Sequence, residues 1–287
     1  MIPGTFAYHR PKSVTEALAL LAQLGPDARP LAGGHSLIPV MKLRLGAPSD
    51  LVDLAGIADL KGVRSDGPNV VIGAMTTQHE VIGSALLAER VPLLRETALL
   101  IADPQVRYVG TIGGNVANGD PSNDMPAVMM ALNADFVVAG PGGERRVAAR
   151  DFYKGLYFTA LEPGEVLTAI RIAPPPQGHG YAYNKLKRKI GDYATAAAAV
   201  ILTVADGKIA TCSAALSNVG DTALFAQEAC DLLVGTSADK ATLAKARAAA
   251  EAITSPASDN HGPAQYRTKM AGVMFERAVA RAFQRAR

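Results

Sequence analysis

Two glycine-rich segments, far apart in the chain, carry residue types suited to binding a diphosphate. They are Ala32-Gly33-Gly34-His35-Ser36 and Thr111-Ile112-Gly113-Gly114-Asn115. A glycine lacks Cβ, so its backbone can adopt a positive φ and approach a ligand closely, and successive N–H groups in such turns form a concave anion site. The alternative is that each pair forms only a tight turn or a bulge. The polar residues beside both pairs favour the binding interpretation.

The residues that follow each glycine pair are typical of helix starts. Ser36 is suited to cap a short helical turn that runs through Arg44, and Asn123 or Asp124 to cap a helix in the apolar segment 125–132. A carboxylate at Asp124 can instead hold a ribose hydroxyl, because both roles use the same acceptor oxygens. The residue types leave both roles of Asp124 open.

Neither glycine pair belongs to a common nucleotide-binding motif. The pattern G-x-G-x-x-G opening a helix, with an acidic residue about twenty positions later, is absent, and so is the phosphate-binding loop of the nucleoside triphosphatases. Dinucleotide binding by this chain therefore requires another fold, with two separate backbone cradles on a mixed sheet.

Composition predicts a globular protein with an ordinary charge balance. The 287 residues are 49% apolar and 19% charged, which excludes wholesale disorder and allows two or three domains. Lys and Arg number 29 against 26 Asp and Glu, and the basic cluster 185–189 is short, so nucleic acid is not an expected partner. The arginines near the carboxyl terminus are spaced for an exposed or partner-facing helix edge: Arg277, Arg281, Arg285 and Arg287.

The two cysteines limit the redox chemistry of the chain. Cys212 and Cys230 form no C-x-x-C motif, so neither a disulfide framework nor a zinc site is indicated. A [2Fe–2S] cluster takes four thiolates, so any iron–sulfur centre belongs on another chain. The amino-terminal residues contain no apolar signal core, and no stretch approaches the length of a membrane span. We therefore expect a cytoplasmic location, and leave open a peripheral contact with the inner face of the membrane through an electron acceptor.

The pattern of apolar and turn residues predicts mixed helices and strands of antiparallel character, without repeated βαβ units. A capping box at Ser13–Glu16 begins a helix that Gly25-Pro26 ends. Strands are expected at 29–32, 51–54, 70–74 and 166–172, with a hairpin at 136–147. Helices are expected at 77–87, 92–101, 241–253 and 271–282. The linker Pro174–Gly180 predicts a boundary between domains 1–177 and 178–287, with subdomains of about 1–55 and 56–177 in the first.

Longer runs of the sequence resemble a known family. The first glycine segment continues as Leu37-Ile38-Pro39, the second is followed by Asn123-Asp124-Met125-Pro126, and a long run extends from Tyr183 to Ala196. With residues 266–274 near the carboxyl terminus, these runs resemble the FAD-binding subunits of the molybdenum hydroxylases. Within that family they are similar to the flavoprotein subunits of the aerobic carbon monoxide dehydrogenases.

The resemblance implies an α+β fold. It consists of an FAD-binding domain of the vanillyl-alcohol-oxidase type, made of two α/β subdomains, and a carboxy-terminal domain with a small antiparallel sheet and a helical bundle. It also implies that residues 32–36 and 111–115 hold the pyrophosphate and neighbouring groups of FAD, and that Ile101 and Asp124 line the cofactor. Lys187 lies in the matching basic segment, where Lys185 is an equally available cation.

Two side chains have specific roles to be tested. His35 follows a glycine pair, where some flavin oxidases carry a covalent flavin anchor; we expect a non-covalent contact, and a turn-capping role is the alternative. Tyr193 follows Gly191, whose freedom permits a turn that projects the ring over the isoalloxazine. The alternative for Tyr193 is a buried core position.

The function implied is electron transfer within a larger enzyme. A large partner subunit with molybdenum oxidises carbon monoxide, a small partner subunit with [2Fe–2S] clusters relays electrons, and the FAD of this chain passes them to an external acceptor. The expected assembly is a dimer of heterotrimers. The alternatives are the FAD subunit of a xanthine- or aldehyde-type molybdenum hydroxylase, a free-standing flavin oxidase, and a nucleotide-binding regulatory module.

Overall fold

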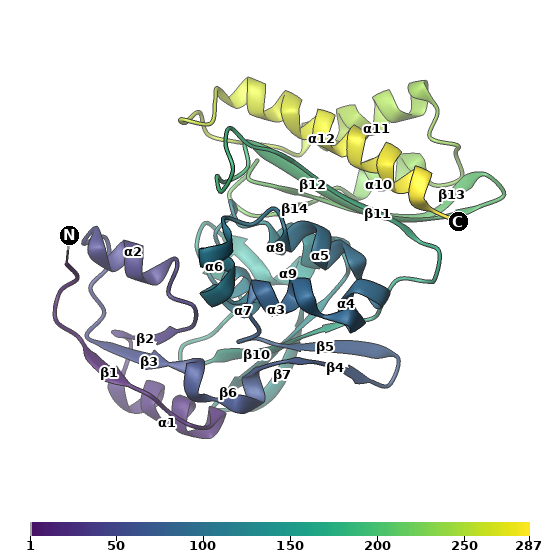
Figure 1. Ribbon diagram of the computed structural model, residues 1–287. Helices are drawn as coiled ribbons and strands as arrows, with labels where there is room; N and C mark the ends of the chain where they lie inside the picture. The colour runs from purple at the N-terminus through teal and green to yellow at the C-terminus, as the bar shows by residue number, and fades with distance from the viewer. Residues whose placement is uncertain (1) are drawn as a thin grey trace.

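The computed structural model describes residues 2–287, which form three main sheets and the helices that cover them (Figure 1). The first sheet is small and parallel, in the order β1-β3-β2. Its strands are β1 (Ala7–His9), β2 (Ala28–Leu31) and β3 (Asp50–Asp53). They are connected by the helices α1 (Val14–Leu24) and α2 (Leu37–Lys42) and followed by the 3-10 turns η1 (Leu54–Gly56) and η2 (Ala58–Leu60).

The first sheet differs from the sequence expectation. Strands joined by α1 and α2 are βαβ units, so the prediction of antiparallel character throughout was wrong for this part. Strand β1 has only three residues, too few to show a periodicity of two. The start of α1 is as predicted, because the Ser13 side chain accepts a hydrogen bond from the Glu16 N–H, and Gly25 ends the helix with a φ of 79°.

The second sheet is antiparallel, in the order β4-β5-β10-β6-β7. Its strands are β4 (Val63–Asp66), β5 (Asn69–Gly73), β6 (Asp135–Gly140), β7 (Gly143–Ala148) and β10 (Val166–Ile172), and a separate small hairpin is formed by β8 (Tyr153–Gly155) and β9 (Phe158–Thr159). The expected hairpin at 136–147 and the strand at 166–172 are therefore present.

A layer of short helices covers one face of the second sheet. It contains α3 (Gln78–Gly83), α4 (Ala85–Arg90), α5 (Pro92–Ala98), α6 (Pro104–Val109), α7 (Ile112–Ala117), α8 (Met125–Ala131) and α9 (Ala149–Phe152). The single helix expected over 77–87 is two helices, because the chain leaves helical geometry at Ser84, whose side chain accepts a hydrogen bond from the Leu87 N–H and caps α4.

The carboxy-terminal part consists of a four-stranded antiparallel sheet beneath three helices (Figure 1). Its elements are β11 (Gly180–Leu186), β12 (Ala196–Ala205), β13 (Lys208–Ser217), β14 (Leu224–Phe225), α10 (Gln227–Leu233), α11 (Lys240–Ala252) and α12 (Ala264–Arg285).

Both faces of this last sheet are buried. In β12, Ala198 and Val200 pack with α10–α12, whereas Ala197 and Ala199 pack with the core that contains α5 and α8. Side chains that alternate along a strand point to opposite faces, so the small alanines allow close approach on both sides. Since Tyr183 lies directly opposite Ala199, the same inner face of β11 is turned towards α8.

Candidate functional site

The fold brings the two glycine segments into contact. A Cβ on Gly33 would lie 2.7 Å from the Gly110 Cα, and a Cβ on Gly114 would lie 3.3 Å from the Ala32 Cβ. The first distance leaves no room for a Cβ on Gly33, and the second is tighter than an ordinary Cβ contact, so the two segments pack closely at these glycines. The prediction that the two segments act together is therefore consistent with their position side by side.

The first segment leaves a run of backbone donors free. It connects β2 to α2, and Gly34 has a φ of 72°. Within residues 2–287, the backbone N–H groups of 32–36 donate to no backbone or side-chain acceptor. Successive N–H groups without a protein acceptor are available to an anion. This segment has the properties expected of a diphosphate cradle.

Ser36 stands at the N-cap of α2, but its side chain does not cap the helix. Its φ of −106° and ψ of −51° are helical, whereas a capping serine normally has extended geometry that directs its oxygen back to the second or third helical N–H. The predicted cap is wrong in this respect. The Ser36 hydroxyl is instead left available beside the free N–H groups.

The second segment is built differently from the expectation. The N–H groups of Ile112 and Gly113 donate to the Thr76 and Ala74 carbonyls, both at 2.9 Å, and the Gly114 N–H donates to the Thr111 Oγ1 at 3.0 Å. The Asn115 N–H donates to the Thr111 carbonyl, so these four donors are all used within the protein. The expectation of free N–H groups at 112–115 is therefore wrong, and neither glycine has a positive φ, whereas contact of this segment with the cofactor stays a prediction.

Packing explains the glycines of the second segment. A Cβ on Gly113 would lie 2.6 Å from the Ala74 Cβ, and one on Gly114 would lie 2.8 Å from the Thr111 Oγ1. The Asn115 side chain accepts a hydrogen bond from the Met125 N–H, which ties α7 to the start of α8. The second segment thus packs closely beside the first and holds α7 against the start of α8.

Asp124 is the centre of a buried polar cluster. Its Oδ2 accepts a hydrogen bond from the Lys185 Nζ at 2.8 Å, and its Oδ1 accepts one from the Tyr183 hydroxyl. The side chains of Lys185 and Asp124 are only 1% and 5% exposed. Burial and the neighbouring Asp124 carboxylate raise the pKa of Tyr183 well above its usual value. Asp124 occupies the N-cap position of α8 without capping it, so the capping role is wrong for its side chain.

This cluster distinguishes the two lysines that the sequence left equivalent. Lys185 is engaged by Asp124 and also donates to the Leu100 carbonyl at 3.4 Å. Lys187 forms no ion pair with any of residues 2–287 and is partly buried. Its pKa is lowered, first by burial and then by the charges of Lys185 and Arg107, while Asp124 acts in the opposite direction. Lys187 is therefore the lysine of the pair that remains able to bind an anion.

Tyr193 lies in the loop between β11 and β12, at the edge of the same region. Its ring is 46% exposed, so the core position considered for it is wrong. Burial raises its pKa, and the charges of Asp120, Tyr157 and Asp124 raise it further, which places these groups near the ring. Gly191, with a φ of 84°, approaches the backbone of Ala102.

Two further predicted residues lie beside this region. His35 is exposed, its ring lies near Gly110, and it makes no hydrogen bond within the described residues, so the turn-capping role is not formed. Ile101 is buried, and its carbonyl accepts a hydrogen bond from the Arg107 guanidinium at 2.8 Å. Arg107 donates to Ile101 and its charge acts on Lys187, and the charge of Asp124 acts on both Lys187 and Tyr193, so these side chains lie in one region.

Sequence reasoning missed several residues of this region. Tyr183 could have been found, because it lies two residues before Lys185 in the same strand and therefore shares its face. Arg107, Asp120 and Tyr157 gave no local signal, since they reach the site only through tertiary packing.

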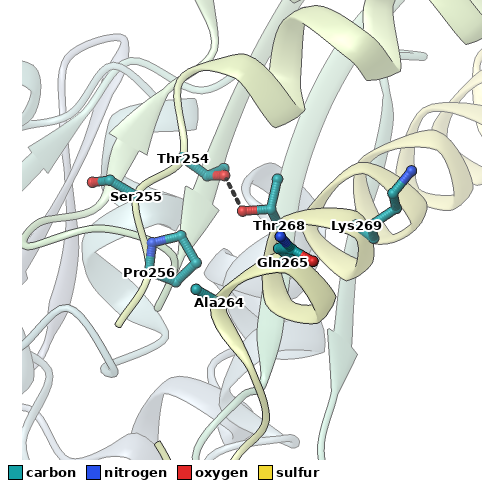
Figure 2. Close-up of a pocket in the computed structure, with 7 residues that line it drawn as sticks. All are labelled: Thr254, Ser255, Pro256, Ala264, Gln265, Thr268 and Lys269. Atoms are coloured by element: carbon teal, nitrogen blue, oxygen red, sulfur yellow. Dashed lines mark hydrogen bonds between the residues drawn. The ribbon is translucent and has the colours of Figure 1, made fainter. Parts of the chain in front are cut away.

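Other features of the described residues do not suggest a separate centre. A hollow of about 390 Å³ beside α12, lined by Thr254, Ser255, Pro256, Ala264, Gln265, Thr268 and Lys269, shares no residue with the region above (Figure 2). Among residues 2–287, no cluster of three or more His, Cys, Asp or Glu side chains is arranged for a metal ion. No helix in the same range has the length and apolarity needed to cross a membrane.

Comparison with known proteins identifies the family. Residues 4–175 match the family described as the FAD binding domain in molybdopterin dehydrogenase, and residues 181–282 match the CO dehydrogenase flavoprotein C-terminal domain. The chain belongs to the FAD-binding subunits of the molybdopterin dehydrogenases.

Full-length relatives and a solved structure agree with this membership. The chain is 67% identical to the carbon monoxide dehydrogenase medium chain of Afipia carboxidovorans over all of both chains. It is 50% identical to the corresponding chain of Hydrogenophaga pseudoflava over 99% of each. A chain in the structure of reconstituted CO dehydrogenase from Oligotropha carboxidovorans is 67% identical, with a TM-score of 0.99 over all of both chains.

These matches confirm three expectations. The resemblance to the flavoprotein subunits of this family is correct, FAD is the cofactor of the domain, and the chain is a subunit of a multi-subunit oxidoreductase. The α+β fold, with an FAD-binding domain followed by a domain with a small antiparallel sheet and helices, is confirmed as well.

Proposed function

We propose that this chain is the FAD-carrying electron-transfer subunit of a carbon monoxide dehydrogenase. Carbon monoxide is oxidised to carbon dioxide at a molybdenum site on a large partner subunit, [2Fe–2S] clusters on a small partner subunit relay the electrons, and this chain delivers them to an external acceptor. The observation that carries the proposal is the 67% identity, over the full length of both chains, to a carbon monoxide dehydrogenase medium chain.

The geometry of the first glycine segment supports FAD binding by this chain's own residues. The free N–H groups of 32–36 and the Ser36 hydroxyl suit the diphosphate, and Lys187 adds a positive charge. We propose as cofactor-contacting residues Ala32, Gly33, Gly34, His35, Ser36, Ile101, Thr111, Ile112, Gly113, Gly114, Asn115, Asp124, Lys187 and Tyr193.

Different residues of the proposed site have different roles in binding the cofactor. When bound, FAD supplies a redox centre that accepts electrons singly and releases them singly or in pairs. Tyr193 covers one face of the ring system, Ile101 shields it from water, and the Asp124–Lys185 pair holds β11 and α8 in register. His35 contacts the cofactor without a covalent bond.

The domain organisation and assembly belong to the same proposal. We assign residues 1–177 to FAD binding, in subdomains of about 1–55 and 56–177, and residues 178–287 to the second domain. Two cysteines are too few for an iron–sulfur cluster, which supports a partner chain for that centre. A dimer of heterotrimers in the cytoplasm remains the expected assembly.

Native purification tests this function. We expect three kinds of chain by native mass spectrometry, with molybdenum and iron on the partners, and yellow FAD released to the supernatant by acid. Colour that stays with the precipitated chain would indicate a covalent flavin oxidase. A colourless protein would favour a regulatory nucleotide-binding module. A monomer that oxidises an organic substrate alone would contradict the proposal.

A further inference from the structure

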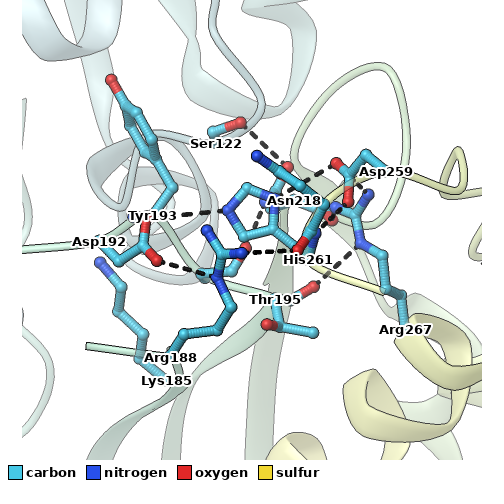
Figure 3. Close-up of polar contacts among 12 residues, drawn as sticks. Ser122, Lys185, Arg188, Asp192, Tyr193, Thr195, Asn218, Asp259, His261 and Arg267 are labelled. Atoms are coloured by element: carbon cyan, nitrogen blue, oxygen red, sulfur yellow. Dashed lines mark hydrogen bonds and ion pairs between the residues drawn. The ribbon is translucent and has the colours of Figure 1, made fainter. Parts of the chain in front are cut away.

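The loop that carries Tyr193 is fastened to a turn before α12 by a polar cluster (Figure 3). The Asp192 Oδ1 accepts a hydrogen bond from the Tyr193 N–H at 3.1 Å, and its Oδ2 accepts one from the Arg188 Nε at 3.2 Å. Arg188 also donates to the Asn260 carbonyl at 2.7 Å. Asp192 is thus bonded directly to the backbone that carries the Tyr193 ring, while the ring is directed away from the cluster.

His261 lies between two carboxylates. Its Nδ1 is 3.3 Å from the Asp259 Oδ2, and its Nε2 is 3.9 Å from the Asp192 Oδ1. The side chain is 14% exposed, and its Nε2 is buried without a hydrogen-bond partner in the described structure. A neutral imidazole has one donor and one acceptor nitrogen, so only the protonated ring presents an N–H to both carboxylates.

The turn that holds His261 is itself fixed to the sheet. The buried Arg267 guanidinium donates to Asp259 and to the Ala257 carbonyl, each at 2.9 Å, and to the Thr195 carbonyl at 3.2 Å. It also donates to the Asn218 carbonyl. His261 therefore projects from a turn that the Arg267 hydrogen bonds hold in place, towards the loop that carries Tyr193.

Two carboxylates and two guanidinium groups lie around His261 (Figure 3). Asp192 and Asp259 attract a protonated ring, whereas Arg188 and Arg267 repel it but are already directed at carboxylates and carbonyls. Burial alone would raise the pKa of Asp192, but Arg188, the Tyr193 N–H and His261 together hold that pKa below its usual value. The balance favours attraction between His261 and the loop.

We propose that His261 is a positioning residue that acts through Asp192 to hold Tyr193 over the flavin. The inference rests on the proposed role of Tyr193 and deepens it. Removing the His261 ring leaves Asp192 held only by Arg188 and the Tyr193 N–H, so we expect the loop to move more freely.

The test compares variants of the full chain, purified natively with the chains that accompany it. His261→Ala should shift the visible flavin spectrum and reduction potential in the direction given by Tyr193→Ala, and should weaken FAD binding about threefold. Asp192→Asn, which changes the loop partner of His261, should shift the flavin spectrum and reduction potential in the same direction and also weaken FAD binding. His261→Gln, which still donates a hydrogen bond, should restore the spectrum. His9→Ala, which removes the 2.7 Å pair with Asp50 in the first sheet, is the matched control and should change nothing at the flavin.

Hydrogen exchange, compared with the flavin spectrum, distinguishes positioning from general stability. Amide exchange in residues 187–195 should be faster in His261→Ala. If exchange is faster but Tyr193→Ala leaves the flavin unchanged, the proposed role of Tyr193 fails and the inference with it. If Tyr193→Ala alters the flavin and both His261→Ala and Asp192→Asn keep the wild-type spectrum and reduction potential, only the inference is overturned.

Discussion

The Glu96 Oε2 on α5 lies 2.7 Å from the Arg285 Nη1 on α12, and this ion pair links the FAD-binding domain to the carboxy-terminal domain. The Glu96 Oε1 also accepts the Tyr183 N–H at 2.8 Å, and Arg285 lies over the ring of Tyr181 at 4.7 Å from its centroid. The carboxy-terminal arginines, expected on an exposed or partner-facing edge, thus include one that faces the other domain of the same chain. Glu96 thus fixes β11, the strand that carries Tyr183 and Lys185.

Replacing Glu96 by alanine should destabilise the chain by about 1–3 kcal/mol, because the Tyr183 N–H and the Arg285 guanidinium lose their shared acceptor. Urea unfolding of the full chain measures the change. Arg277→Ala is the control, since Arg277 is exposed on the same helix and makes no ion pair within residues 2–287. Equal stabilities of the two variants would show that the pair does not hold the interface.

The two lysines of β11 and its extension should respond in opposite ways. Lys185→Met leaves the Asp124 carboxylate buried without its cation and should cost about 3–5 kcal/mol of stability. Lys187→Met should unfold like the wild type but lose FAD more readily. Unfolding curves and the flavin-to-protein absorbance ratio measure both effects. Loss of FAD at unchanged stability in Lys185→Met would reverse the assignment.

Two serines at helix N-caps give a matched pair. The Ser36 hydroxyl caps nothing, so Ser36→Ala should leave unfolding unchanged and weaken FAD retention. Ser13 does cap α1, so Ser13→Ala should cost about 1 kcal/mol and leave FAD retention unchanged. Thermal unfolding and equilibrium dialysis of FAD check these outcomes. A stability loss in Ser36→Ala without any change in FAD binding would remove Ser36 from the site.

Glu165 provides a pH-dependent contribution to stability. The hydrogen bonds from Arg145, at 2.7 Å and 2.6 Å, lower the pKa of Glu165 against the opposing effect of burial. A carboxyl whose pKa is lower in the folded state stabilises the protein above its unfolded-state pKa, and this contribution is lost as the pH falls through the folded-state pKa. The stability difference between wild type and Glu165→Gln should therefore be present at neutral pH and shrink in acid. A difference that stays constant down to acid pH would contradict the ion-pair account.

The sequence predicted elements whose signals are local. The Ser13 capping box, the hairpin at 136–147 and the strand at 166–172 each depend on neighbouring residues, and all three are formed. Strand β1 was missed because three residues show no periodicity, and the parallel pairing of β1 and β2 with β3 depends on contacts distant in sequence.

In the candidate site, too, the features with a local sequence signal were predicted, and those that depend on contacts distant in sequence were not. The first glycine segment was recognised from residue types, and its free N–H groups agree with the expected chemistry. The second was recognised for the wrong reason, because Gly113 is required for contact with Ala74 and its N–H is already bonded. Residue types alone do not reveal whether a donor is free. The choice between Lys185 and Lys187 likewise required the position of Asp124.

The most direct test of the proposed function is the response of the flavin to carbon monoxide. Carbon monoxide added without oxygen to the natively purified protein, with its accompanying chains, should bleach the visible flavin absorbance, and an added electron acceptor should restore it. The separated full-length chain, reloaded with FAD, should not respond to carbon monoxide. A flavin that stays oxidised in the assembled protein under carbon monoxide, yet is bleached by a purine or an aldehyde, would contradict carbon monoxide as the substrate.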